Sequence, residues 1–104
     1  MRIMRPSFAL DEALKTLGLN LKNARLRRAL PQSVIAERAG ISLNTLSKIE
    51  NGDPGVSIGN VASVVHALGL TSAISTLASS ENDPIGLANE ARYLPRRVRA
   101  KKSE

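Results

Sequence analysis

Two short helical segments, separated by a glycine turn, constrain this chain more than any other feature of its sequence. Pro31 ends the segment before it, because the residue that precedes a proline is disfavoured in helical geometry. The pattern then predicts a helix over Gln32 to Arg38, a turn at Gly40, which can adopt positive φ, and a helix over Leu43 to Glu50 that stops at Asn51. A pair of short helices joined by a tight turn is therefore the centre of the predicted fold.

A longer helix is expected before this pair. From Ser7 to Leu30 apolar residues recur at helical spacing, and Ser7 has the side chain of an N-cap. Gly18 interrupts the pattern at a cost of about 1 kcal/mol relative to alanine, so we expect the segment to bend or split there. The part expected to face the core is Leu17 to Arg28.

Three further helical segments follow. Ser57 can cap a fourth helix that runs to Leu68, and a fifth is expected over about Ser72 to Ala78 with Ile74 and Leu77 pointing inward. After a polar, turn-rich break, a short helix is expected over Ile85 to Tyr93. The predicted fold class is therefore all-α.

The pair of short helices has the form of a helix-turn-helix, in which the second helix lies exposed in a DNA major groove and the first fixes its angle. The small Ala36 lets the two helices approach closely, and the inward positions are apolar: Val34, Ile35, Ala39, Ile41, Leu46 and Ile49. The second helix then exposes mostly short hydrogen-bonding side chains and one cation: Leu43, Asn44, Thr45, Ser47 and Lys48. For Thr45 and Ser47, plain solvation is an open alternative.

The charge of the chain favours a polyanionic partner. Fifteen Lys and Arg residues against nine Asp and Glu give a net charge of +6 and a pI near 10.5. The last fifteen residues hold six basic and two acidic side chains, and the rest of the chain contributes only +2. The excess is thus concentrated in a C-terminal tail. Beyond Pro95 its basic run lacks apolar residues to pack, so this part is expected to be disordered or to fold on binding.

Several classes of function are disfavoured by what the sequence lacks. The chain has no cysteine, and His66 is its one histidine, so we expect neither a metal site nor a cofactor. A nucleophile with a base, or a carboxylate pair set in a pocket, is not evident, so we expect no enzyme. Apolar runs fall well short of the roughly 20 residues that span a bilayer. We therefore expect a cytoplasmic protein with no membrane partner.

One stretch of the chain resembles a known family. The sequence LPQSVIAERAGISLNTLSKIENGDPGVSIGNVASVVHALGL is similar to the Cro and lambdoid-repressor type of helix-turn-helix, the XRE family. The likeness covers Leu17 to Leu70, with the AERAGIS, LSKIENG and ALGL blocks in the expected order and spacing. Within that family it most resembles HipB-like antitoxins and regulators, through GDPGVSIGNVASVVHALGL and the basic ending LPRRVR.

The resemblance implies a role for individual residues. It places Leu43, Asn44, Ser47 and Lys48 at base edges, although the position of Leu43 is often polar in phage repressors. A surface or dimer contact is the alternative for Leu43. The residues implied at the DNA backbone are Gln32, Ser42, Thr45, Asn51 and Arg25. Arg25 and Glu50 match a pair that bridges the first and third helices, which we assign mainly to structure.

The fold implied is a five-helix, lambda-repressor-like DNA-binding domain with a short C-terminal helix and a basic tail. We expect an N-terminal extension and the start of the first helix over residues 1–16, the DNA-binding domain over 17–78 and a C-terminal extension over 79–104. For the tail, three roles stay open, namely phosphate contacts, docking on a partner protein, and solubility. Its basic residues are Arg96, Arg97, Arg99, Lys101 and Lys102.

The function implied is an autoregulatory repressor of a bacterial toxin–antitoxin operon. Such a protein would bind double-stranded DNA at a palindromic operator as a homodimer, associate with the nucleoid, and bind a HipA-like serine/threonine kinase toxin. Two alternatives remain, namely a protein-interaction module that acts mainly on the partner kinase, and a free-standing regulator of the phage type.

Overall fold

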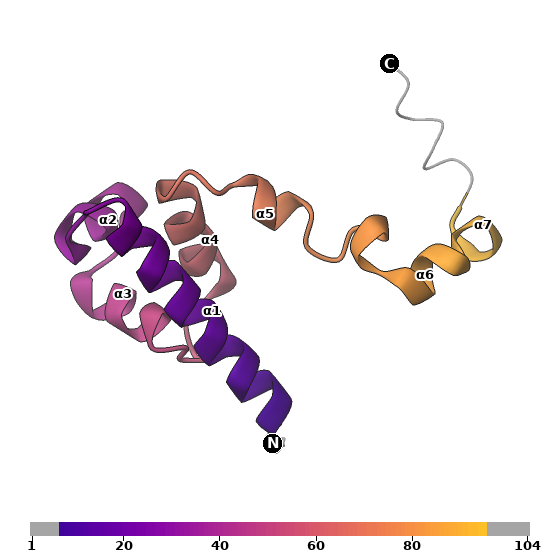
Figure 1. Cartoon of the computed structure of the whole chain (residues 1–104), viewed down its shortest axis with the longest axis horizontal. Coiled ribbons are helices and arrows are strands. Elements are labelled where there is room, and N and C mark those ends of the chain that lie inside the picture. Colours follow the sequence, from indigo (N-terminus) through magenta and orange to yellow (C-terminus); the bar gives the residue numbers. More distant parts are fainter. Residues whose placement is uncertain (1–6, 96–104) are drawn as a thin grey trace. The chain divides into compact units, whose positions relative to one another are not determined.

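The computed structural model describes residues 7–95, and the regular secondary structure in this range is entirely helical (Figure 1). The predicted all-α fold is confirmed. The chain divides into two compact units, Met1–Ile74 and Ser75–Glu104. Among the described residues, no helix has both the length and the apolar character needed to cross a bilayer. The helices of the first unit are α1 (Phe8–Arg27), α2 (Gln32–Ala39), α3 (Leu43–Glu50) and α4 (Ile58–Ala67). A short helix, α5 (Ser72–Ser75), follows, and its last residue is the first of the second unit.

Serine caps fix the starts of α1, α3 and α4, and those at Ser7 and Ser57 match the caps predicted from the sequence. The hydroxyl oxygen of Ser7 accepts a hydrogen bond from the backbone N–H of Leu10 at 3.2 Å. Ser42 and Ser57 accept in the same way at the starts of α3 and α4. These bonds satisfy backbone N–H groups that have no partner inside their helices, so each serine favours one starting point.

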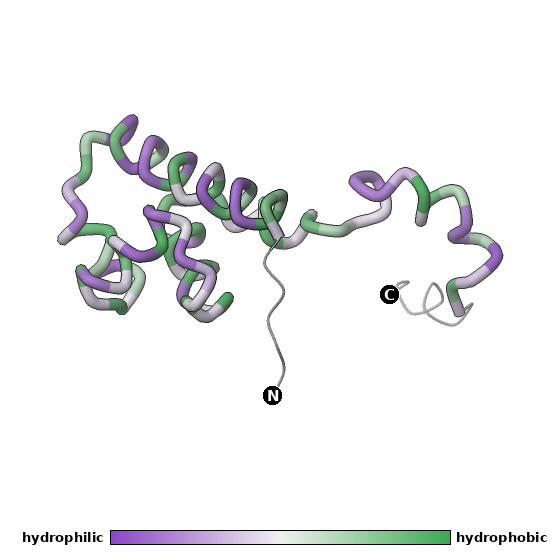
Figure 2. Tube along the Cα trace, turned by 90° about the horizontal axis from the view of Figure 1, so that it is seen from below, coloured by the Kyte–Doolittle hydropathy of each residue, from purple (hydrophilic) through white to green (hydrophobic). Residues whose placement is uncertain are grey.

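The core of the first unit is aliphatic and draws on four helices. Along α1, apolar residues recur with intervening polar ones (Figure 2). Of the inward positions expected from the sequence, Ile35, Leu46 and Ile49 are buried in this core, and Ala39 and Ile41 pack against it. Val34, which was also expected to point inward, is half-buried and is not part of the core. Ile35 and Leu46 have no exposed surface. The full buried cluster is Leu21, Ala24, Ile35, Ala36, Leu46, Ile49, Val64, Val65 and Leu68. Because α3 contributes Leu46 and Ile49 to this cluster, one side of α3 is fixed and the other is left outside.

Gly18 has a different role from the one expected. α1 runs through it without a break, and Gly18 is buried. A Cβ atom at this position would lie 2.5 Å from the carbonyl oxygen of Glu50 and 2.6 Å from that of Ile49. Gly18 therefore allows the backbone of α1 to lie directly against the end of α3, and it does not bend the helix.

The first half of α1 extends past the core. Leu10 is 56% exposed and Leu17 is 39% exposed, although their spacing continues that of the buried Leu21 and Ala24. The expectation that the core-facing part begins at Leu17 is thus wrong for that side chain. Helical periodicity identifies an apolar side of a helix, but it does not determine how far along the helix the neighbouring elements reach.

The expectation for the fifth helix is also wrong in part. α5 ends at Ser75, and Ile74 and Leu77, which were expected to point inward, are 39% and 72% exposed. The backbone turns out of helical geometry soon afterwards, with Ala78 at φ 64°. Leu77 lies beyond the end of α5, and a helix of four residues makes too few contacts to bury Ile74.

In the second unit the helices are short. A 3₁₀ turn, η1 (Ser80–Asn82), precedes α6 (Pro84–Ala88) and α7 (Glu90–Tyr93), so the single helix expected over Ile85 to Tyr93 is divided in two. Asp83 caps α6 by accepting from the N–H of Gly86, and Pro84 occupies the first turn, where its missing N–H costs nothing. None of the described residues of this unit is buried.

Replacing Gly18 with alanine should destabilise the protein, because the new methyl group would overlap the carbonyl oxygens at the end of α3. We expect a loss of about 1–3 kcal/mol in the free energy of unfolding, typical of overpacking, measured by urea denaturation. Gly59→Ala is the matched control. A Cβ at Gly59 meets nothing closer than 4.0 Å, so this change should be neutral or stabilising. Equal effects at the two positions would contradict the close-approach role of Gly18.

Candidate nucleic-acid interface

A tight turn fixes the angle between α2 and α3. Gly40 adopts the left-handed conformation, with φ 71° and ψ 32°. The N–H of Ile41 then donates to the carbonyl oxygen of Ala36 at 3.0 Å, and Ile41 packs against the core. α3 begins two residues later, at Leu43. The turn and the buried side of α3 together hold its opposite side towards solvent.

The exposed side of α3 carries three of the four residues predicted to read bases. Leu43 is 51% exposed, and Asn44 and Lys48 are also exposed. Asn44 and Lys48 are four positions apart, so they lie on the same side of the helix. This side can offer a carboxamide and an ammonium group to a ligand while its leucine offers apolar surface.

Ser47, the fourth predicted base-reading residue, lies differently. It is half-buried, and the side-chain amide of Gln32 on α2 lies 3.4 Å from its hydroxyl oxygen. Thr45 is also half-buried, and its hydroxyl oxygen accepts a hydrogen bond from Ser42 at 3.0 Å. The hydroxyl groups of Ser42, Thr45 and Ser47 thus have hydrogen-bond partners within the protein, whereas the side chains of Asn44 and Lys48 are exposed to solvent.

Arg25 and Glu50 form a buried ion pair between α1 and α3. Arg25 donates to the carboxylate twice, from Nε at 2.7 Å and from Nη2 at 3.0 Å. Its Nη1 donates to the carbonyl oxygen of Leu30, and Gln32 donates to Glu50 Oε1 at 3.0 Å. The hydrogen bond with Glu50 raises the pKa of Arg25, against the opposing effect of burial. Each charged group therefore has partners that compensate its removal from water.

A polar hollow opens over this ion pair, beside α3. It is lined by residues of three helices and of the loop after α3: Lys22, Arg25, Gln32, Ser47, Glu50 and Asn51. The structure thus brings three of the residues predicted to contact the DNA backbone to the same place, namely Arg25, Gln32 and Asn51. Lys22 was missed by sequence reasoning. Lys22 lies three positions before Arg25 and therefore on the same side of α1, and this spacing could have indicated its place at the site.

The start of α2 also lies at this hollow. Pro31 is the N-cap residue and supplies no side-chain hydrogen bond, so the backbone N–H groups of Gln32 and Ser33 at the start of the helix have no side-chain cap. These groups, with the helix dipole, favour an anion. On the other side of α3 a second hollow is lined by Thr45, Lys48, Asp53, Gly55, Val56, Ser57 and Asn60. The exposed side of α3 is therefore flanked by polar surface on both sides.

The basic residues of the tail, namely Arg96, Arg97, Arg99, Lys101 and Lys102, lie outside the described residues. Within residues 7–95, no three His, Asp or Glu side chains gather as metal ligands would.

Removal of either charge of the ion pair should leave the other buried without its partner. We expect Arg25→Met and Glu50→Leu each to lower the free energy of unfolding by about 3–5 kcal/mol. The double variant should recover part of the loss, because it buries no charge. A double-mutant cycle by urea or thermal unfolding measures this, and purely additive effects would rule out the energetic coupling.

Comparison with known proteins identifies the domain. The family described as a helix-turn-helix domain matches residues 16–74, which is more than half of the chain. No match was found among curated proteins or solved structures. The matched segment contains α2, the tight turn, α3 and every residue that lines the polar hollow. The chain therefore belongs to the helix-turn-helix domain family of DNA-binding regulators.

Proposed function

We propose that this protein is a sequence-specific transcriptional repressor that reads DNA with the exposed side of α3. The observation that carries the proposal is the division of α3 into a side anchored by Leu46 and Ile49 and a side that presents Asn44 and Lys48. A recognition helix needs both properties, because its reading side chains must be exposed and their backbone must be held at a fixed angle. We propose that the protein binds DNA and does not catalyse a reaction.

Each reading residue has a chemical preference. Asn44 can pair bidentately with adenine, and Lys48 can donate to O6 or N7 of guanine. Leu43 can contact the methyl group of thymine. Gln32 is assigned to the phosphate backbone together with Asn51, because both line the polar hollow beside α3. Ser47 contributes to DNA binding by holding the side chain of Gln32, whose amide nitrogen lies 3.4 Å from the Ser47 hydroxyl oxygen.

The proposed repressor acts as a homodimer on a palindromic operator. A single α3 reaches only a few base pairs, so useful discrimination among genomic sites requires two half-sites about one helical turn apart. Two copies related by a twofold axis would present two α3 helices to such a site. Binding to DNA would place the protein at the bacterial nucleoid.

A second proposal concerns a protein partner. The likeness to HipB-like antitoxins suggests a toxin–antitoxin operon and a HipA-like kinase toxin. The second unit supports a protein-binding role, because its described part carries large exposed apolar side chains and buries none: Leu77, Ile85, Leu87, Tyr93 and Leu94. Isolated apolar residues on short helices are suited to folding onto another protein.

The reading residues can be tested by substitution. We expect Asn44→Ala and Lys48→Ala each to cost about 1–3 kcal/mol of binding free energy at the cognate site and to relax the preference for one base. Gln32→Ala should weaken binding to all sequences alike. The cognate site is first found by footprinting on the DNA upstream of the protein's own gene, and affinities are then measured on that duplex and on single-base variants.

Asn23→Ala is the matched control, since Asn23 is an exposed asparagine on α1. It should leave both affinity and discrimination unchanged. The assignment of α3 as the reading helix fails if Asn44→Ala and Lys48→Ala both keep the full affinity and base preference of the wild-type protein.

The partner proposal predicts a separation of two activities. Ile85→Asp and Leu87→Asp should abolish co-purification with a kinase encoded beside the gene, while DNA binding and the melting temperature stay unchanged, because neither side chain is buried. Leu19→Asp, which alters an apolar residue of α1 that is 52% exposed, should retain the kinase. Retention of the kinase by all three variants would show that the second unit does not bind it.

A further inference from the structure

Two lysines of α1 have side chains with no polar partner inside the protein. Lys15 and Lys22 are exposed, and within residues 7–95 neither ammonium group forms a salt bridge or a hydrogen bond. They are seven positions apart, so they lie on nearly the same side of the helix, about 20° from each other around its axis. Their Cα atoms are separated by roughly 10 Å along that axis.

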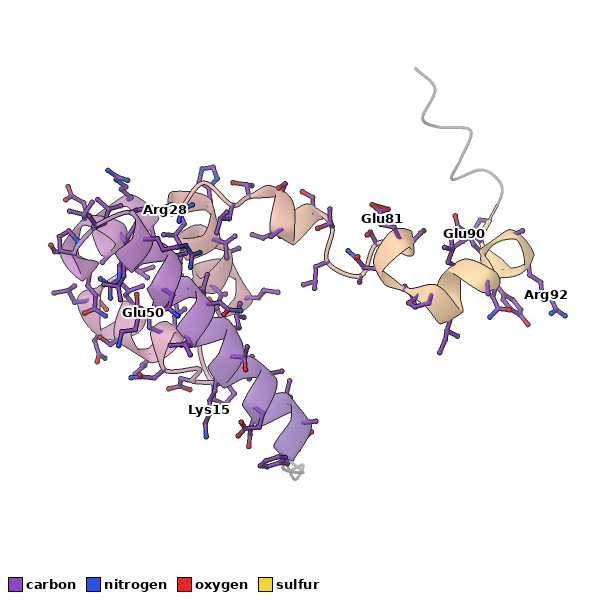
Figure 3. All side chains as sticks on the ribbon, in the orientation of Figure 1. Lys15, Arg28, Glu50, Glu81, Glu90 and Arg92 are labelled. Carbon is purple, nitrogen blue, oxygen red and sulfur yellow. The ribbon has the colours of Figure 1, made fainter. Side chains whose placement is uncertain are left out.

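Both lysines lie beside the end of the proposed reading helix. Lys22 lines the polar hollow together with Asn51. Lys15 lies next to Gly52, the residue after Asn51, because a Cβ at Gly52 would be 2.7 Å from the Cα atom of Lys15. Figure 3 shows Lys15 on the side of α1 on which α3 lies. Both lysines thus lie beside the turn that follows α3.

The charges around the hollow favour an anion there. The carboxylate of Glu50 is already neutralised by Arg25 and hydrogen-bonded by Gln32. Lys22 is therefore left as the uncompensated charge at the rim, next to the uncapped start of α2. Asp11 and Glu12 lie on the preceding turn of α1, and among the described residues neither carboxylate forms a salt bridge with Lys15.

We propose that α1 provides a second contact to the DNA backbone, in which Lys22 binds a phosphate at the polar hollow and Lys15 binds another phosphate further along the strand. The inference rests on the proposed function, because it takes the ligand of α3 to be duplex DNA. Lys15 lies outside the family match, which begins at residue 16. The first half of α1 thus extends the DNA-binding surface of this chain beyond the common domain.

The test uses the salt dependence of binding, which counts phosphate contacts without reference to base sequence. Affinity of the full-length protein is measured over a range of salt concentrations on the footprinted operator duplex and on random-sequence duplex DNA. We expect Lys15→Ala and Lys22→Ala each to weaken binding to both duplexes and to reduce the slope of log K against log salt by about 0.9. The double variant should lose about twice as much slope.

Two sets of controls make the result specific. Arg27→Ala removes an exposed cation from the same helix, about 140° around its axis from Lys22, and should leave the slope unchanged. Lys15→Arg and Lys22→Arg keep the charge and should keep the slope. Melting temperatures of all variants should equal that of the wild-type protein, because neither ammonium group has a partner in the fold.

The outcomes separate the two proposals. If the wild-type protein binds its operator and Asn44→Ala relaxes base preference, but the lysine variants have the same slope as Arg27→Ala, the contact by α1 is wrong and the repressor function stands. If the wild-type protein shows no salt-dependent binding to any duplex, the proposed function fails, and this inference fails with it.

Discussion

The buried ion pair between Arg25 and Glu50 holds the DNA-binding unit together. It joins the first helix to the end of the third, and Gln32 adds the start of the second through the same carboxylate. The three helices that must keep fixed relative positions for DNA recognition therefore meet at one charged group. An apolar contact could tolerate a small slide of one helix over another, whereas two hydrogen bonds from a planar guanidinium group to a carboxylate specify both distance and orientation.

The close approach of α1 to the end of α3 works with this ion pair. Gly18 and Gly52 leave no room for a Cβ atom, so the two backbones lie directly against each other. This arrangement brings Lys15 and Lys22 beside the turn after α3, where the proposed phosphate contacts are made. A helix that supports the core on one side can thus contribute to the ligand-binding surface on another, without any change in its backbone.

The two units of the chain bury their residues to very different extents. The first has an aliphatic core drawn from four helices, whereas the described part of the second has short helices and no buried residue. Rigidity suits the reading of base edges, since misplaced side chains lose their hydrogen bonds. Exposed apolar residues on short helices suit a surface that becomes ordered on a partner, which is the role proposed for the second unit.

The sequence alone determined the order of the first four helices, the serine caps of α1, α3 and α4, the glycine turn at Gly40 and the apolar side of α3, because these depend on residues close together in the chain. The resemblance to repressors also indicated that Arg25 and Glu50 pair between the first and third helices. Only the tertiary structure showed that Gly18 permits a backbone contact, that Ser47 faces Gln32 and that Lys22 lines the hollow. It also showed that Leu17, Ile74 and Leu77 are exposed. Local pattern says which side of a helix is apolar, but whether another element covers that side depends on contacts between residues far apart in the sequence.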